Sequence, residues 1–400
     1  MRPIVLVCLA VLVAQGGCII GIPEPTPTSA SPTTVTVTTP TTDTTAPSTT
    51  APPPRSCVEQ MPGPAPPSLP DLFAPSLVVF TDSRALRLDF SSTEGRYVVA
   101  RNVSLAARGP VLLGDSIYAR NGMYEATKVL RLDRNLVEQQ NWTVEKLGAM
   151  HRHGDALLVA ANRSLFALRP DLSRIGNVTT PYPGMEGNEW YYKMVDSIVV
   201  HDNVAYLVDD VWVPFYFYRV DVTNLGQMNI LETKQLGGAA TSYRKQWIDP
   251  DADVWVVLRN SGSPGYEEHA LHLFQASTGA DKGSIQLYQR SGAETGNPVA
   301  AILEEPSPWA VIRANERACL TRLRLEGSTV TFDHLVDLNV PLRGGEGYGT
   351  STTQPIVLTD GLLYTGLQNT LIIIEADATP RTLLLQDLGM GIHDIAVLDG

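Results

Sequence analysis

Two histidines stand at a spacing that could support metal chemistry. His151 and His153 are two residues apart in "HRHGD", so on a strand both side chains would project from the same face. Paired histidines can bind zinc. The sequence identifies no third ligand, although His201 and His393 are expected on strands that correspond to the strand of His151 and His153 in other repeats of the chain. Packed or solvated histidines are the simpler interpretation, and we predict no metal site.

Alternating aspartates form a second candidate. In "DPDADVW", Asp249, Asp251 and Asp253 resemble the start of a calcium-binding loop. An EF-hand loop would place glycine at the sixth position and glutamate at the twelfth. Val254 and Asn260 stand at those positions. We therefore interpret this segment as a turn with solvated carboxylates.

Nothing else in the sequence predicts catalysis or a cofactor. The glycine-rich "RGGEGYG" lacks the Lys-Ser/Thr pair of a phosphate-binding loop, and no G-x-S-x-G motif is present. Four glutamates could support glycoside chemistry if a suitable pair lay close together. They are Glu186, Glu189, Glu267 and Glu268. An exported hydrolase or lyase is thus an alternative to a non-catalytic protein. It would use these carboxylates or a metal bound by the histidines.

The elements that would position these residues are β-strands. An apolar strand, an acidic or glycine turn and a second branched or aromatic strand recur along the chain, as in "PVLLGDSIYARN", "SIVVHDNVAYLVDD" and "PIVLTDGLLYTGLQN". Gly-Asp, Asp-Asn and Asp-Gly between two such runs are hairpin signals, because tight turns need positive φ. Two more strands follow each hairpin. The repeat of roughly 40–55 residues is typical of a four-stranded β-propeller blade.

Seven such units can be counted, and the two ends of the repeat complete one another. The first unit, "SLVVFTDSRALRLDFSSTEGRYVVA", lacks an innermost strand, and the chain ends on a single strand, "HDIAVLDG". We therefore expect an all-β, seven-bladed propeller at 77–400, closed by pairing of the C-terminal strand with 77–80. The architecture resembles the WD40, YVTN and PQQ-like repeat propellers. Eight blades and, less favoured, a two-sheet sandwich are the alternatives.

One face of such a propeller is predicted to carry the long connections. They are 179–194, 209–214, 260–269, 290–298 and 339–354. Long loops on a rigid scaffold are common binding sites, and aromatic and arginine side chains are enriched at interfaces. The candidate ligand-binding residues on this face are Tyr182, Trp190, Tyr191, Trp212, Tyr266, Glu267, Arg343 and Tyr348. The alternative is that the aromatic side chains only cap the blades.

The N-terminal region has the features of an export signal and a stalk. Arg2 precedes an apolar run of about ten residues, half of the roughly twenty that a membrane-spanning helix needs. Small residues before Cys18 resemble the lipobox of bacterial lipoproteins, although Gln15 replaces the usual leucine. That resemblance implies a signal peptide at 1–17 and lipidation of Cys18. An ordinary secretory signal is the alternative.

The segment that follows is predicted to be a spacer. Residues 18–56 are dominated by Thr, Pro, Ser and Ala, so they cannot bury a core and are expected to be a disordered stalk. Residues 57–76 would be a strap that leads into the fold. Cys57 and Cys319, outside the signal and the lipobox, could form a disulfide in an oxidising compartment.

Charge narrows the range of partners. The formal net charge is −12, and no Lys/Arg-rich run is present, which argues against nucleic acid as a partner. The sequence therefore predicts an exported protein, lipid-anchored to the bacterial cell envelope at the outer membrane or cell surface. Its propeller would be a non-catalytic binding or scaffold module for a protein or glycan.

Overall fold

The computed structural model describes twelve segments of the chain, all C-terminal to residue 72. They are 73–122, 126–181, 195–209, 215–236, 241–249, 252–263, 266–291, 309–314, 317–326, 329–341, 356–376 and 380–398. The chain divides into two units, Met1–Thr45 and Ala46–Gly400, and every described residue belongs to the second. The predicted signal, stalk and strap lie outside the described residues, except for residues 73–76 of the strap. No helix among the described residues is long and apolar enough to cross a bilayer.

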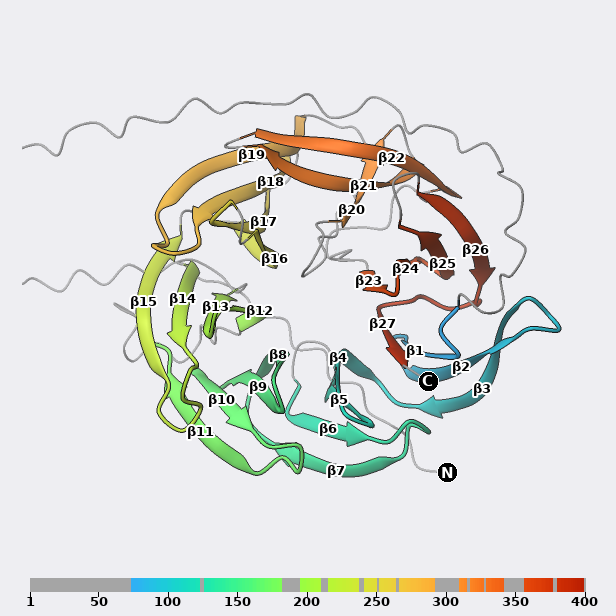
Figure 1. Ribbon diagram of the computed structural model, residues 1–400, viewed down its shortest axis with the longest axis horizontal. Coiled ribbons are helices and arrows are strands. Elements are labelled where there is room, and N and C mark those ends of the chain that lie inside the picture. The colour runs from blue at the N-terminus through green and yellow to red at the C-terminus, as the bar shows by residue number, and fades with distance from the viewer. Residues whose placement is uncertain are drawn as a thin grey trace, which may run out of the picture. The chain divides into compact units, whose positions relative to one another are not determined.

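The second unit is an all-β propeller of antiparallel sheets (Figure 1). We number the sheets 1 to 7 in chain order. Sheet 1 has the strand order β27-β1-β2-β3. Its strands are β1 (Ser76–Phe80), β2 (Arg84–Ser91), β3 (Arg96–Ser104) and β27 (Asp394–Leu398).

Sheets 2 to 4 each contain four consecutive strands. Sheet 2 contains β4 (Ala107–Leu113), β5 (Ser116–Asn121), β6 (Lys128–Leu132) and β7 (Glu138–Thr143). Sheet 3 contains β8 (Leu147–His153), β9 (Ala156–Ala161), β10 (Ser164–Leu168) and β11 (Arg174–Thr179). Sheet 4 contains β12 (Val195–His201), β13 (Val204–Asp209), β14 (Phe215–Asp221) and β15 (Asn229–Leu236).

Sheets 5 and 7 repeat this pattern, and sheet 6 has three described strands. Sheet 5 contains β16 (Thr241–Asp249), β17 (Val254–Ser263), β18 (Tyr266–Gln275) and β19 (Asp281–Ser291). Sheet 6 contains β20 (Trp309–Ala314), β21 (Arg317–Glu326) and β22 (Thr329–Pro341). Sheet 7 contains β23 (Ile356–Thr359), β24 (Leu362–Leu367), β25 (Thr370–Glu375) and β26 (Arg381–Asp387). Of the seven four-stranded blades that the sequence predicts, the described residues show six. Three described strands form sheet 6.

In sheets 2, 3 and 7 the second strand is the most buried and the outermost strand is the most exposed. β9 has the sequence ALLVAA and is buried along its whole length, because both faces of a strand near the centre are covered by neighbouring sheets. β7, the outermost strand of sheet 2, has the sequence EQQNWT and is almost entirely exposed. The apolar runs of the second strands thus form the core, as their composition predicts.

The predicted hairpin turns have the expected backbone. The turn between β12 and β13 has φ of 48° at Asp202 and 60° at Asn203. The turn between β23 and β24 has φ of 48° at Asp360 and 77° at Gly361. Glycine, asparagine and aspartate tolerate positive φ better than other residues, so the turn dipeptides fix the position of each hairpin.

The core consists of apolar clusters, most of which join two neighbouring sheets. Residues of sheets 1 and 2 form one cluster, sheets 2 and 3 a second, and sheets 3 and 4 a third. Further clusters join sheets 4 and 5, sheets 6 and 7, and sheets 7 and 1. At these six junctions each sheet is therefore stabilised by the next, as expected for radially packed blades.

Sheets 3 and 4 approach one another through backbone atoms. A Cβ on Gly148 of β8 would overlap the carbonyl oxygen of Val195, the first residue of β12. Gly176, on the outermost strand of sheet 3, has the same relation to the carbonyl oxygen of Leu225. Both ends of this contact thus require a residue without a side chain.

The strand nearest the C-terminus belongs to the sheet of the first strand. β27 pairs antiparallel with β1, with Val397 opposite Leu77 and Ile395 opposite Val79, as the sequence predicts. Ile395 and Val397 belong to the cluster shared with sheet 7, whereas Ala396 and Leu398 belong to the cluster shared with sheet 2. Alternate side chains of β27 therefore contact the sheets on both sides.

Candidate functional site

Most of the predicted ligand-binding residues lie outside the described residues. They are Tyr182, Trp190, Tyr191, Trp212, Arg343 and Tyr348. Cys18, the predicted lipidation site, also lies outside them. Tyr266 and Glu267 are the first two residues of β18, where they pair with Ser263 and Gly262. The long loop predicted at 260–269 is therefore wrong, because β17 and β18 extend through most of that segment.

The strand bounds show where the longest connections of the propeller lie. They are 180–194, 292–308 and 342–355, and each runs from the last described strand of one sheet to the first described strand of the next. The turns between first and second strands are short, as at 114–115, 154–155 and 202–203. We use the term linker face for one end of the sheets. At this end the chain passes from one sheet to the next, and the second strand of each sheet is connected to the third. The opposite end is the turn face.

The histidines considered for metal binding lie at opposite ends of their sheets. The expectation that His393 lies on a strand equivalent to that of His201 is wrong, because β27 begins at Asp394. His153 and His201 lie at the turn-face ends of β8 and β12, whereas His393 precedes β27 at the linker face. Among the described residues, no group of three or more His, Cys, Asp or Glu side chains could hold a metal ion. The Asp249 carboxylate accepts a hydrogen bond from the Ala252 amide, so this aspartate caps its own turn.

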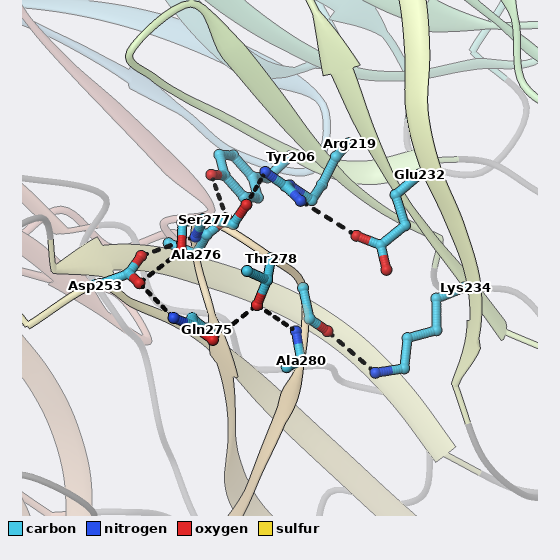
Figure 2. A network of polar contacts seen from close by, with 11 residues as sticks. Tyr206, Arg219, Glu232, Lys234, Asp253, Gln275, Ala276, Ser277, Thr278 and Ala280 are labelled. Atoms are coloured by element: carbon cyan, nitrogen blue, oxygen red, sulfur yellow. Dashed lines mark hydrogen bonds and ion pairs between the residues drawn. The ribbon is translucent and has the colours of Figure 1, made fainter.

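Asp253 anchors a polar network between sheets 4 and 5 (Figure 2). Its carboxylate accepts hydrogen bonds from the Ser277 amide and hydroxyl, at 2.8 and 2.7 Å, and from Gln275 Nε2 at 2.9 Å. The turn 276–280 that these bonds order receives donors from sheet 4. Arg219 donates to the Ser277 carbonyl at 2.6 Å, and Lys234 donates to the Gly279 carbonyl at 3.1 Å.

The same arrangement recurs between sheets 1 and 2. Arg87 lies on the third strand of sheet 1, as Arg219 does in sheet 4. It donates to Asn135 Oδ1 at 2.7 Å, in the turn between β6 and β7. Third-strand arginines thus link a sheet to the following one. The Asp253 network therefore holds adjacent sheets together.

The hydrogen bonds in this network predict how stability depends on pH. The Ser277 hydroxyl, more than any other group, lowers the pKa of Asp253, and Gln275 acts in the same direction. A carboxylate with a depressed pKa in the folded state contributes stability above its unfolded pKa, and this contribution is lost as the pH falls through the folded pKa.

Asp253→Asn is therefore expected to lower Tm at pH 7 by about 1–2 °C, the size expected for a surface network in a chain this long. At pH 3 the difference from the parent protein should be smaller. Thermal melts at both pH values test this, with Ser277→Ala as a second variant that removes the main donor. An unchanged or larger difference at pH 3 would show that Asp253 acts by another route.

A second polar cluster lies at the linker face, where sheets 1 and 2 meet. Arg108 of β4 donates from Nη2 to Asp82 Oδ1 at 3.0 Å, and Asp82 lies in the turn between β1 and β2. His393 Nε2 lies 2.7 Å from the same Asp82 oxygen, although the angle is not that of a hydrogen bond. The Gly109 amide donates to Asp394 Oδ2 at 3.1 Å. Residues from both ends of the propeller therefore form one charged cluster.

Arg108 is buried despite its charge. Its side chain retains 8% of its accessible surface, against 79% for that of Asp82. Burial lowers the pKa of the Arg108 guanidinium, and the carboxylates of Asp394 and Asp82 act in the opposite direction. Nη1 of Arg108 has no hydrogen-bond partner among the described residues. Such a group costs free energy unless an anion or another acceptor satisfies it.

The sequence contains only a weak signal for this cluster. Arg108 interrupts an otherwise apolar strand in "AARGPVLLG", and buried arginines are rare unless they are paired. Its partners could not be predicted, because Asp394 is separated from Arg108 by most of the propeller and Asp82 reads as an ordinary turn residue.

Cys319 is disulfide-bonded and lies fully buried on β21. The other three cysteines, Cys8, Cys18 and Cys57, lie outside the described residues. The predicted pair Cys57–Cys319 therefore stays a prediction, but Cys319 as a free thiol is excluded.

Comparison with known proteins supports the fold. No protein-family model and no curated protein sequence matches the chain. A protein from Lactobacillus plantarum is similar in structure, with a TM-score of 0.57 at 11% identity over 82% of this chain and 100% of that one.

Two more distant structures have TM-scores below 0.5. A periplasmic gluconolactonase from Pseudomonas aeruginosa gives 0.48 at 13% identity, over 81% of this chain and 99% of that one. Apo AztD from Citrobacter koseri gives 0.43 at 12% identity, over 80% and 96%. At such identities a likeness is one of fold alone. The chain is thus a β-propeller whose similarity to known structures carries no function with it.

Proposed function

We propose that this protein is an exported β-propeller, anchored to the cell envelope through Cys18, that binds a protein or glycan through its linker face. The observation that carries the proposal is the placement of the long connections 180–194 and 342–355, which both join one sheet to the next, as 292–299 would if sheet 6 begins at residue 300. Rigid antiparallel sheets with long connections at one end are a common arrangement for binding proteins. Four aromatic residues of the predicted site belong to two of these connections: Tyr182, Trp190, Tyr191 and Tyr348.

The proposal includes a closed ring of seven blades. β20 to β22 would be the second, third and fourth strands of sheet 6, because β22 is followed by a long link to sheet 7, as the other outermost strands are followed by links to the next sheet. The first strand would then come from "AAILEE", residues 300–305, which lies outside the described residues. The pairing of β27 with β1 would close the ring.

The disulfide supports export. Stable disulfides form mainly in extracytoplasmic compartments, and Cys319 is already bonded. We propose Cys57 as its partner, since Cys8 would be removed with the signal and Cys18 would be lipidated. Peptide mapping of the non-reduced protein should recover residues 57 and 319 in one cross-linked peptide. Recovery of a Cys18–Cys319 peptide would contradict both the pairing and the lipid anchor.

The binding role can be tested with the two tryptophans of the candidate site. The purified chain would be applied to an array of immobilised polysaccharides and envelope proteins. The double variant Trp190→Ala/Trp212→Ala should lose about 2–4 kcal/mol of binding free energy, since buried aromatic side chains dominate many interfaces. Its Tm should stay within about 2 °C of the parent value, because substitutions that remove only ligand contacts change stability little.

The matched control is Trp142→Ala, which removes a half-buried tryptophan from the outermost strand β7. It should leave binding unchanged. A large fall in Tm for the double variant would show that Trp190 and Trp212 are structural. Retained binding at an unchanged Tm would exclude them from the site.

A further inference from the structure

The charge of the propeller is divided unequally along the chain. Residues 73–180 contain 14 Lys and Arg against 10 Asp and Glu, a net charge of +4. Residues 181–400 contain 14 Lys and Arg against 28 Asp and Glu, a net charge of −14. The first of these segments forms β1–β11, that is, sheets 1 to 3 apart from β27. An overall acidic protein thus has one basic sector.

Within this sector the excess positive charge lies at the linker face. Each link is taken here together with the two strand residues on either side of it. The linker face of sheets 1 to 3 has six cations, Arg84, Arg108, Arg120, Lys128, Lys146 and Arg163, against Asp82, Glu145 and Asp394. The sequence of the partly described link between β5 and β6 adds one carboxylate, Glu125, which gives six cations against four carboxylates. The turn face has six cations against six carboxylates among the described residues.

Three of these cations occupy equivalent positions in consecutive sheets. Arg84 is the first residue of β2 and Lys128 is the first residue of β6, while Arg163 directly precedes β10. Each therefore lies at the start of the third strand of its sheet, next to the connection from the second strand. Arg84 and Lys128 are exposed, and Arg163 is half-buried. We call these three residues the cationic arc.

The surface that carries the cationic arc is continuous. Hydrogen bonds order the links of this face within sheets 2 and 3, join sheet 2 to sheet 3 at one place, and join sheet 1 to sheet 2 through Arg108 and Asp82. The Gly122 amide donates to the Ala106 carbonyl at 2.8 Å, and the Leu147 amide donates to the Ala126 carbonyl at 2.9 Å. The Thr180 amide donates to the Arg163 carbonyl at 2.8 Å. The spacing of the cations is thus fixed by the scaffold and not by loop conformation.

We propose that the cationic arc binds an acidic polysaccharide across the linker face of sheets 1 to 3. One cation in each of three successive sheets suits a polymer whose carboxylates repeat at regular intervals. Guanidinium groups pair well with carboxylates, and two of the three cations are arginines. Buried Arg108 lies at the same face, where Asp82 and Asp394 balance its charge, and its Nη1 has no hydrogen-bond partner among the described residues. The acidic sector would repel the same polymer, which confines it to sheets 1 to 3.

This inference rests on the proposed binding role of the linker face and specifies a ligand class for its sheets 1 to 3. The connections 292–308 and 342–355, which join sheets 5 to 7, are not part of this footprint. The test uses the full chain and three immobilised polyanions: polygalacturonate, alginate and hyaluronate. Dextran is the uncharged control. Retention on at least one polyanion is expected, with none on dextran, and affinity should fall about tenfold or more between 50 and 500 mM NaCl because screening weakens exposed charge pairs.

The matched variants change the same number of charges on opposite faces. Arg84→Gln/Lys128→Gln/Arg163→Gln should weaken binding about tenfold or more, as expected for loss of three interface charges. Arg96→Gln/Arg134→Gln/Arg169→Gln removes one turn-face cation from each of the same three sheets and should change binding less than about twofold. Equal effects of the two triple variants would overturn the inference.

Other outcomes separate this inference from the proposed function. No retention on any of the three polyanions would overturn the inference. So would binding of polyglutamate or of phosphatidylglycerol vesicles in place of the polysaccharides, or salt-sensitive self-association of the chain in sedimentation. If instead a neutral glycan is captured and the linker-face triple variant binds it normally, the arc has no role but the binding function stands.

Discussion

A chain that lacks residues 394–400 is expected to lose its cooperative unfolding transition. The deletion removes β27, whose residues Ile395 to Leu398 are each only 4–5% exposed. Burial of a large apolar side chain contributes about 1.5–3 kcal/mol. The deletion also uncovers β1 and the two clusters that sheet 1 shares with sheets 7 and 2. The combined loss is comparable with the whole stability of a typical domain, about 5–15 kcal/mol.

Differential scanning calorimetry and near-ultraviolet circular dichroism would measure this effect. Deletion of residues 399–400 alone is the control, because β27 ends at Leu398. The control should melt as the parent protein does. A cooperative transition of unchanged Tm in the 394–400 deletion would mean that β27 contributes nothing to the fold and that the ring need not be closed by it.

Trp255→Ala is expected to cost about 3–5 kcal/mol of unfolding free energy, the usual range for removal of a large aromatic side chain from a core. Trp255 is fully buried on β17. Its ring centroid lies 4.7 Å from that of Phe217, 5.1 Å from Phe274 and 5.2 Å from Tyr206. Phe217 and Tyr206 belong to sheet 4, so the resulting cavity would open between two sheets.

The indole N–H of Trp255 also contributes to the stability of the fold. Its Nε1 donates to Gln246 Oε1 at 2.8 Å, and Gln246 Nε2 donates to the Tyr206 carbonyl at 2.9 Å. Gln246 itself is completely buried. Trp255→Phe keeps most of the ring but leaves the Gln246 oxygen without this donor, which should cost about 1–3 kcal/mol.

Chemical denaturation of both variants, together with Trp142→Ala, tests this ordering. Trp142 is half-buried on β7 and contacts Phe166 at a centroid distance of 5.1 Å, so its removal should cost less than that of Trp255. The order Trp255→Ala, Trp255→Phe, Trp142→Ala in decreasing cost is the expected result. A Trp255→Ala variant as stable as Trp142→Ala would show that the packing interface between sheets 4 and 5 tolerates a large cavity.

The fold was predictable because its signals are local and repeated. Turn dipeptides such as Asp202-Asn203 specify hairpins, and the runs between them are long enough only for strands. The pairing of β27 with β1 was predictable because the first repeat unit lacks an innermost strand and the last strand of the chain has no hairpin partner of its own. The loop at 260–269 was wrong because its Gly, Ser and Pro residues read as a loop, although β17 and β18 pair through it in the structure.

The polar sites were less predictable because their members are far apart in sequence. Arg108 and Asp394 meet only when the two ends of the propeller come together. Arg219 and Ser277 meet only when sheet 4 packs on sheet 5. The cationic arc depends on equivalent positions in three sheets, which can be compared only when the strand bounds are known. Sequence patterns specify strands, whereas such sites depend on how the strands are stacked.

The membership of β27 in sheet 1 has a consequence for biogenesis. β1, β2 and β3 are synthesised before any other described strand, and β27 is synthesised after all of them. The contacts between β1 and β27 therefore span more than 300 residues, and contacts of such long range slow folding. Until translation reaches Leu398, β1 has an unpaired edge, so a chain still emerging from the ribosome would lack its finished first blade.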